Sequence, residues 1–313
     1  MTFLKADRQF SRECGECGVC FMKIMFVGIG LIGGSMALAL KDYPDAELYG
    51  VDRDGQTRLD ALSCGAVRDC WADAQAAPLE SMDVLVICLP PEAAADFIRR
   101  QAHRLKAGAL LTDVCGVKRP LYQAVESIEN RAFTYLGGHP MAGKECGGFA
   151  SASADLFRGS HYILTPDDTV SEDAVRLMER LTAHMGCADI VYATPQEHDE
   201  RIGYTSQLMH VMALALCDQH LLFDSCGFEG GSFRGATRVA ALDAGLWTEL
   251  MWANRDTLAD LVDELQEKMD EYSALLRGDD RGALHKRLEA SSGRKKEFDR
   301  RHGGAQSLKP LPG

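Results

Sequence analysis

The stretch KIMFVGIGLIGGSMALALK, residues 23–41, decides the fold that we expect. It begins with a short apolar run, passes through a glycine-rich turn and continues as a helix-forming segment, which together predict a strand–turn–helix unit. Gly28, Gly30 and Gly33 stand at G-x-G-x-x-G spacing. In a dinucleotide-binding turn the first glycine permits the tight turn, the second lets the backbone approach a pyrophosphate, and the third allows close packing of helix on strand. The phosphates would lie at the N-terminus of the helix.

A second apolar run, ELYGVD, ends in Asp52, about 20 residues beyond the glycines, where an acid can bind the adenosine ribose hydroxyls. A carboxylate there repels the 2'-phosphate of NADP, so we expect NAD as cofactor, although the adjacent Arg53 could soften this repulsion. The alternative interpretation of Asp52 is a turn residue at a strand end. The residues expected to contact the cofactor are Gly28, Ile29, Gly30, Leu31, Ile32, Gly33, Asp52 and Asp113.

Further apolar runs follow at regular intervals with helical stretches between most of them, as in parallel strands that are covered on both faces. They occupy residues 82–90, 109–118, 133–140, 161–166 and 188–195. The segment SEDAVRLMERLTAHMG between the last two predicts a helix with Ser171 as its N-cap. We therefore expect an α/β fold, with a Rossmann-type doubly wound, mostly parallel sheet forming a dinucleotide-binding domain over residues 22–194.

From Pro195 onward the pattern is helical only. Two long helical patterns, residues 197–222 and 246–278, flank a glycine-rich break at 228–238 that could itself open a helix. The segment from Val211 to Cys217 is apolar all round, which suggests burial within a bundle or at a subunit contact. We expect an all-helical substrate and dimerisation domain over residues 195–301 and a homodimer formed through these helices.

Composition restricts the partners of the chain. Its 313 residues carry a formal net charge of -12, which argues against nucleic-acid binding, because phosphate neutralisation requires clustered lysine and arginine. No apolar run of about 18 residues predicts a membrane span, and no secretory signal pattern is present. We expect a cytoplasmic protein with a small-molecule substrate and no metal.

Three cysteines near the start, Cys14, Cys17 and Cys20, have the C-x2-C-x2-C spacing of part of an iron–sulfur ligand set. The C-x3-C-P continuation is missing, and three ligands do not close a metal site. We expect residues 1–21 to be a disordered or artefactual leader and residues 302–313 to be a disordered tail.

The segment GGHPMAGKE, residues 137–145, places His139 just past the carboxyl end of a predicted parallel strand, the edge where doubly wound sheets bind ligands. Pro140 restricts the histidine backbone to extended conformations. A neutral imidazole, with a pKa of about 6.5, is suited to accept a proton at neutral pH. The alternative is a loop histidine that hydrogen-bonds to backbone groups.

Over residues 22–301 the chain resembles the prephenate and arogenate dehydrogenases of tyrosine biosynthesis. The resemblance is carried by VGIGLIGGSMALAL, TDVCGVK, GGHPMAGKECGGFASASADLF, TPQEHDE, SQLMH and FRGATRVA. It implies NAD-dependent oxidative decarboxylation of prephenate to 4-hydroxyphenylpyruvate. In this family the histidine at the position of His139 takes the proton of the ring hydroxyl as hydride leaves for the nicotinamide.

The resemblance also assigns the substrate pocket. Arg238 matches the anchor of the side-chain carboxylate, for which a guanidinium fork is suited, and Arg234 lies nearby in sequence. His210 matches a pocket histidine, and Trp247 matches a tryptophan that approaches the pocket from the partner subunit. Without the resemblance these residues would be interpreted as surface arginines, a packed helix histidine and a core or interface tryptophan. His198 is interpreted as structural or as part of the pocket rim.

One departure from the family lies at Gly116, where relatives usually carry a serine that orients the catalytic histidine and the substrate hydroxyl. A water molecule could replace that hydroxyl, or Cys115 could act as a weak donor. We expect activity with weaker alignment. Gly235 also stands where many relatives have an acid.

Three other functions remain open. Arogenate dehydrogenase activity differs only in the amino group of the substrate side chain, and no residue excludes it. Another Rossmann-fold hydroxy-acid dehydrogenase would favour a catalytic lysine, for which Lys118 is a candidate. A non-catalytic NAD(H)-responsive protein would bind the cofactor without turnover and use the cysteine run as a redox sensor.

Overall fold

A computed structural model describes residues 21–144 and 146–301 of the chain. The expected cysteine leader, apart from Phe21, and the expected C-terminal tail lie outside these residues. The chain divides into two compact units, the first ending at Leu258 and the second beginning at Ala259. The first unit contains the whole sheet and the helices as far as α9.

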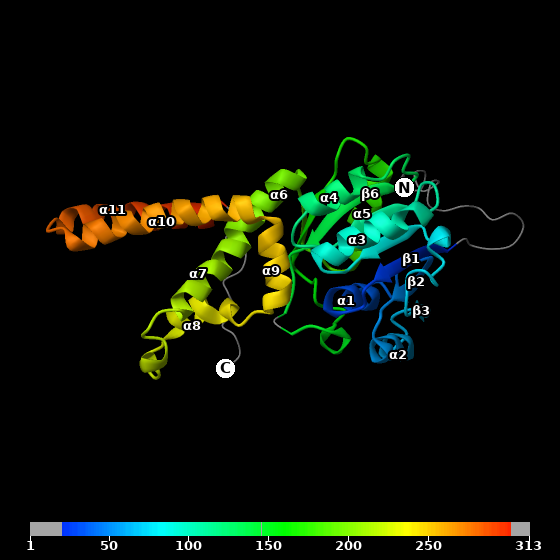
Figure 1. Ribbon diagram of the computed structural model, residues 1–313, viewed down its shortest axis with the longest axis horizontal. Helices are drawn as coiled ribbons and strands as arrows, with labels where there is room; N and C mark the ends of the chain where they lie inside the picture. The colour runs from blue at the N-terminus through cyan, green and yellow to red at the C-terminus, as the bar shows by residue number, and fades with distance from the viewer. Residues whose placement is uncertain (1–20, 145, 302–313) are drawn as a thin grey trace, which may run out of the picture. The chain divides into compact units, whose positions relative to one another are not determined.

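The sheet has eight strands in the order β3-β2-β1-β4-β5-β6-β7-β8. The strands at one end of this order, β3, β2 and β1, are labelled in Figure 1. All neighbouring pairs are parallel except β6 with β7, so the expected doubly wound, mostly parallel sheet is confirmed. The strand order reverses between β1 and β4, which is where doubly wound sheets bind their ligands. The strands are β1 Met22–Val27, β2 Ala46–Val51, β3 Asp69–Trp71, β4 Val84–Ile87, β5 Leu110–Asp113, β6 Thr134–Pro140, β7 His161–Thr165 and β8 Asp189–Tyr192.

Strand β6 has two halves with different partners. Its first half, residues 134–136, pairs in parallel with β5, and its second half, residues 137–140, pairs antiparallel with β7. His139 therefore lies beyond the parallel part of β6, as the sequence predicted, and within its antiparallel extension, opposite Ile163. The pairing with β7 extends β6 beyond the point at which β5 stops. The short strand β3 was not predicted.

The two faces of the sheet carry separate apolar cores, because successive strand residues point to opposite faces. On β1, Ile24 and Phe26 join the core formed with α1 and α5, whereas Met25 and Val27 join the core formed with α3 and α4. Burial of both faces explains the nearly continuous apolar runs in the sequence. The helices of this part are α1 Leu31–Ala39, α2 Gly55–Ser63, α3 Pro91–Gln101, α4 Arg119–Glu126 and α5 Glu172–His184.

Beyond β8 the elements that the structure describes are all helices, joined by turns and loops, as expected. Thr194 caps α6 in a capping box with Glu197. The elements of this part are α6 Pro195–Ile202, a π-helix η4 at Gly203–Gln207, α7 Leu208–Cys217, α8 Gly231–Thr237, α9 Ala244–Ala253, α10 Arg255–Arg277 and α11 Arg281–Arg301. Among residues 21–144 and 146–301, no helix is long and apolar enough to cross a membrane.

Candidate active site

A cavity of about 770 Å³ opens where residues 30–32, 88–91 and 114–116 leave the carboxyl ends of β1, β4 and β5. His139 and Pro140 at the end of β6 line it as well, and residues between 202 and 250 of the helical segment form the opposite wall. Of the residues expected at the site, the lining includes Gly30, Leu31, Ile32, Gly116, His139, His210, Arg238 and Trp247. The structure thus brings together residues that are widely separated in the sequence.

The glycines of the first turn have the geometry that their spacing predicts. Gly28 has a φ of +90°, in the left-handed region that favours glycine. A Cβ atom on Gly33 would overlap the carbonyl oxygen of Gly28, so the helix packs on the turn as closely as backbone allows. A Cβ atom on Gly30 would meet nothing within 4 Å, which leaves this part of the backbone open toward the cavity. Ile29 is fully buried and contributes to the core, so only its backbone is available at the turn.

Asp52 lies directly after β2, and protein groups fix the orientation of its carboxylate. Oδ2 accepts a hydrogen bond from the backbone N–H of Ile29 at 2.8 Å, and Oδ1 accepts one from the N–H of Asp54 at 2.9 Å. These bonds tie the end of β2 to the glycine turn. The carboxylate retains lone pairs for further donors, because an ionised carboxylate offers about four acceptor positions.

The expected role of Asp113 in cofactor contact needs correction. Its side chain is fully buried beneath the cavity and accepts hydrogen bonds from Tyr135 Oη at 2.8 Å and from the N–H of Cys115 at 2.8 Å. Lys118, also fully buried, forms an ion pair with Asp113 and donates to the carbonyl oxygens of Cys115 and Gly138. The pair fixes the loop after β5 against β6.

The same contacts decide whether Lys118 could act as the catalytic lysine of another Rossmann-fold dehydrogenase. Its ammonium group is enclosed by three acceptors, and the residue is not part of the cavity lining. A reacting substrate could not reach it. The structure therefore does not support a Rossmann dehydrogenase reaction through Lys118.

The glycine pair before the histidine is required by packing. A Cβ atom on Gly137 would overlap Thr165 Oγ1, and one on Gly138 would lie 2.7 Å from Tyr162 Oη and 2.8 Å from the Asp113 carbonyl oxygen. Larger residues would force β6 away from β7 and β5. The pair thus allows β6 to bring His139 to the cavity wall.

His139 is the first member of a chain of hydrogen bonds that runs away from the cavity. Its Nδ1 lies 2.9 Å from His198 Nε2, and His198 Nδ1 lies 2.8 Å from Asp199 Oδ1. His198 and Asp199 are each 1% exposed. The sequence predicts for His198 only a structural or pocket-rim role, whereas His198 lies in direct contact with the proposed base.

Burial is the main cause of the lowered pKa of both His139 and His198. It holds the pKa of His139 well below its ordinary value, and the neighbouring His198 and Lys118 lower this pKa further. Burial also lowers the pKa of His198, although the hydrogen bond to Asp199 acts in the opposite direction. Both imidazoles are therefore neutral at pH 7, so His139 is able to accept a proton.

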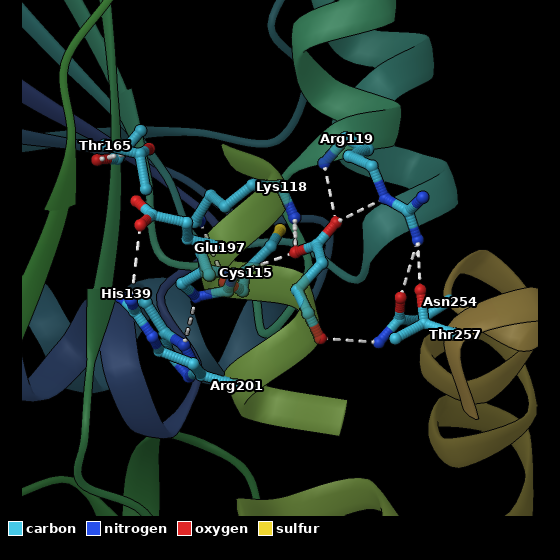
Figure 2. Close-up of polar contacts among 12 residues, drawn as sticks. Cys115, Lys118, Arg119, His139, Thr165, Glu197, Arg201, Asn254 and Thr257 are labelled. Carbon is cyan, nitrogen blue, oxygen red and sulfur yellow. Dashed lines mark hydrogen bonds and ion pairs between the residues drawn. The ribbon is translucent and has the colours of Figure 1, made fainter. Parts of the chain in front are cut away.

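Asp199 is held by groups from α4 and from the start of α10. It accepts hydrogen bonds from the backbone N–H of Lys118 at 2.7 Å and from the N–H of Arg119 at 3.0 Å. Figure 2 shows the guanidinium of Arg119 reaching on to Asn254 and Thr257. Its Nη2 lies 2.7 Å from Asn254 Oδ1 and 3.1 Å from Thr257 Oγ1. The N-terminus of α4 is thereby linked to α6 and to the start of α10.

The helical wall presents a second histidine. His210 donates from Nδ1 to the carbonyl oxygen of Ser206 at 2.9 Å, and its ring stacks on Trp247 with 3.5 Å between centroids. Burial lowers the pKa of His210, the bond to Ser206 raises it, and Arg238 lowers it again. Trp247 thus contacts His210 of its own chain, whereas the resemblance placed it at the pocket of the partner subunit.

The π-helix η4 shapes this wall. Ser206 and Gln207 lie in it, and both line the cavity together with His210 in the following turn. Such wide turns are frequent at functional sites. The turn was not visible in the apolar periodicity of the sequence.

Arg234 does not belong to the cavity. It is exposed on α8 and pairs with Glu229, whose Oε1 lies 3.4 Å from its Nη2. The expected role of Arg234 in substrate binding is therefore not supported by its position, whereas Arg238, one helical turn later, lines the cavity.

Gly116 lies against the proposed base. A Cβ atom at this position would be 3.9 Å from His139 Nε2 and 3.2 Å from Leu250 Cδ2. A side chain here would thus lie between the histidine and α9. A serine here, as the resemblance leads one to expect, would face the nitrogen that remains free when His139 Nδ1 is bonded to His198.

Comparison with known proteins identifies the family. The family model for the prephenate dehydrogenase nucleotide-binding domain matches residues 36–191, and the model for the prephenate dehydrogenase dimerization domain matches residues 194–290. The chain belongs to the prephenate dehydrogenase family. Its match to the prephenate dehydrogenase of Bacillus subtilis (strain 168) is 29% identical over 264 residues, covering 82% of this chain and 71% of that protein.

Other relatives and solved structures differ in the activity that their names state. The cyclohexadienyl dehydrogenase of Zymomonas mobilis is 30% identical, over 78% of this chain and 84% of that protein. The structure of prephenate dehydrogenase from A. aeolicus, in complex with hydroxyphenyl propionate and NAD+, has a TM-score of 0.80 at 24% identity, covering 89% of this chain and 99% of that one. Synechocystis arogenate dehydrogenase has a TM-score of 0.77 at 24% identity, with coverages of 89% and 100%. These structures support the fold.

Proposed function

We propose that this chain catalyses the NAD-dependent oxidative decarboxylation of prephenate to 4-hydroxyphenylpyruvate, with His139 as the base. The main support for the proposal is a single cavity that is lined by the glycine turn, by the neutral imidazole of His139 and by the guanidinium of Arg238. The glycine turn is suited to a dinucleotide, the histidine to a hydroxyl proton, and Arg238 to a carboxylate. Membership of the prephenate dehydrogenase family supports this combination.

The turn after β1 fits NAD. Gly30 provides no side-chain cap for α1, so the first N–H groups of this helix are available to a pyrophosphate. Asp52, fixed by the N–H of Ile29, is placed to bind ribose hydroxyls and to repel a 2'-phosphate. When bound, NAD supplies a nicotinamide ring that accepts hydride.

His139 would act twice in one turnover. As hydride leaves the carbinol carbon of prephenate, His139 accepts the hydroxyl proton and a ring ketone forms. Loss of the ring carboxylate as carbon dioxide then moves an electron pair through the ring to the ketone oxygen. That oxygen recovers the proton from His139, which completes the phenol and leaves the base ready for another substrate.

The charges around the cavity favour prephenate over arogenate. Among the described lining residues, Lys144 and Arg238 are cationic, and Asp243 is the carboxylate. Asp243 Oδ1 already accepts a hydrogen bond from the N–H of Leu246 as the N-cap of α9. Both substrates carry two carboxylates that these cations would attract, whereas the ammonium group that only arogenate carries would meet more positive than negative charge among these residues.

The test is formation of NADH by the purified chain, followed by its absorbance, with NAD and either prephenate or arogenate. We expect NADH with prephenate, a much smaller rate with arogenate, and loss of turnover in His139→Asn with NADH binding retained. His161→Gln, a change at an exposed histidine on β7, is the matched control. Absence of NADH with both substrates would contradict the proposal, and a higher rate with arogenate would correct its substrate.

We also propose that the chain forms a homodimer through its helical segment, which begins at a domain boundary near Thr194. Large apolar side chains remain exposed on this segment in the single chain, and the matching family model is described as a dimerization domain. Contiguous exposed apolar surface marks interaction sites. The exposed residues include Met209, Met212, Leu216, Leu246 and Trp252.

A further inference from the structure

Two side chains behind His139 have no part in the chemistry described above. His198 and Asp199 are each 1% exposed, and neither lines the cavity. A buried carboxylate and a buried imidazole are costly unless they are paired. Their pairing ends on the base itself, through the 2.9 Å contact between His139 Nδ1 and His198 Nε2.

Hydrogen-bond directions along this chain follow from its buried end. Asp199 accepts from the backbone N–H of Lys118, so its carboxylate is an acceptor, and His198 Nδ1 must donate to it. A neutral His198 then has a lone pair on Nε2, which can only accept from His139 Nδ1. The remaining lone pair of His139 is on Nε2, the nitrogen that lies next to Gly116 at the cavity wall.

We propose that His198 and Asp199 are positioning residues that keep His139 Nε2 unprotonated, and that His198 holds the proton displaced from His139 Nδ1 between hydride transfer and decarboxylation. This inference rests on the proposed function. It adds a second proton-accepting residue, which does not touch the substrate, to the site.

The proton movements balance. The substrate hydroxyl proton passes to His139 Nε2 while the proton on His139 Nδ1 passes to His198 Nε2, so that His139 remains neutral. His198 becomes an imidazolium beside the Asp199 carboxylate. When carbon dioxide leaves, His198 returns a proton to His139 Nδ1 and His139 returns one from Nε2 to the phenolic oxygen.

Charge placement favours His198 as the holder of this proton. Its Nδ1 lies 2.8 Å from a carboxylate, whereas the cavity wall at His139 is shared with the cationic Lys144 and Arg238. An imidazolium is more favourable next to an opposite charge than among like charges.

Other charged groups surround the relay from the neighbouring elements. Lys118 disfavours a cation on either histidine, and Asp113, its ion-pair partner at the end of β5, partly offsets it at His198. Arg119 at the start of α4 pairs with Asp199 at 3.2 Å. Of the two histidines, only His198 bonds directly to a carboxylate.

The experiment compares His198→Gln with His198→Ala. A glutamine amide can accept the hydrogen bond from His139 Nδ1 but cannot carry a proton, whereas alanine does neither. We expect kcat to fall at least about tenfold in both variants, with the KM for NAD changed less than twofold. In His198→Gln the acid limb of the kcat profile should move to lower pH, because His139 loses its route to the Asp199 carboxylate.

Full activity in His198→Gln, or an unmoved acid limb, would overturn proton holding by His198. His161→Gln controls for histidine loss, and NADH fluorescence titration checks that each variant keeps its fold and cofactor site. A wild-type chain that is inactive on prephenate would instead contradict the proposed function.

Nitrogen-15 NMR of the imidazoles tests the relay without turnover. Protonated Nδ1 and unprotonated Nε2 are expected in His139, and the reverse tautomer would overturn the inference.

Discussion

Replacing Gly116 by serine tests how this chain aligns its base without the hydroxyl that its relatives carry. Gly116 does not have a positive φ, so the backbone accepts a side chain. The new Cβ atom would lie 3.9 Å from His139 Nε2, which allows a serine Oγ to reach hydrogen-bond distance of about 2.8 Å. The closest neighbour, Leu250 Cδ2 at 3.2 Å, is the end of a flexible side chain and needs to move by only a few tenths of an ångström.

The magnitude follows from one added hydrogen bond. A net gain of about 1 kcal/mol in the transition state corresponds to a rise in kcat/KM of about fivefold. Because the displacement of Leu250 takes part of this gain, we expect an increase of about two- to fivefold, measured as NADH formation from prephenate at saturating NAD. Gly116→Ala introduces the same Cβ atom without the hydroxyl and is expected to be equal to or slower than the wild type.

Two results would refute this reasoning. A loss of about tenfold or more in Gly116→Ser, with NADH binding intact, would show that the glycine itself is required at this position. Equal rates in the serine and alanine variants would show that the hydroxyl does not engage His139. In either case, the hydrogen bond with His198 would be the contact that aligns His139.

Two further predictions concern the parts that hold the site. Gly33→Ala should weaken NADH binding by at least about tenfold and lower the free energy of unfolding, because its Cβ atom overlaps the Gly28 carbonyl oxygen. Gly30→Ala, whose Cβ atom meets nothing within 4 Å, should weaken NADH binding without loss of stability in the free protein; equal stabilities of the two variants in urea would contradict this distinction. Lys118→Met should lower the free energy of unfolding by about 3–5 kcal/mol, because it leaves Asp113 buried without its ion-pair partner, and a change below about 1 kcal/mol would show that the pair is not needed.

The features that could be predicted from the sequence are those in which a few neighbouring residues decide the structure. The tight turn requires a left-handed residue at Gly28 and no side chain at Gly33, and both requirements can be recognised from spacing alone. Buried parallel strands are recognisable because both faces must be apolar. The placement of His139 near the carboxyl ends of the strands followed from these two facts.

Features that depend on a partner distant in sequence could not be predicted in this way. The run at 133–140 gives no sign that its second half pairs antiparallel with β7, because this depends on where β5 ends. Asp113 looks like a strand-end carboxylate facing a ligand, and only the position of Lys118 shows that it is buried in an ion pair. The same applies to His198, whose neighbours in EHDE suggest only the first turn of a helix.

The break between α9 and α10 shows why the relay could not be derived from helical periodicity. Apolar spacing predicts one helix over residues 246–278, but Asn254 leaves the helical conformation, with φ -119° and ψ 20°. Its amide then donates to the Asp199 carbonyl oxygen and to Gln207 Oε1, both at 2.8 Å, and its Oδ1 accepts from Arg119. The interruption of the helix is thus stabilised by the same contacts that fix Asp199 behind the two histidines. Asn254 therefore belongs to the support of the base, although it lies far from His139 in sequence and outside the cavity lining.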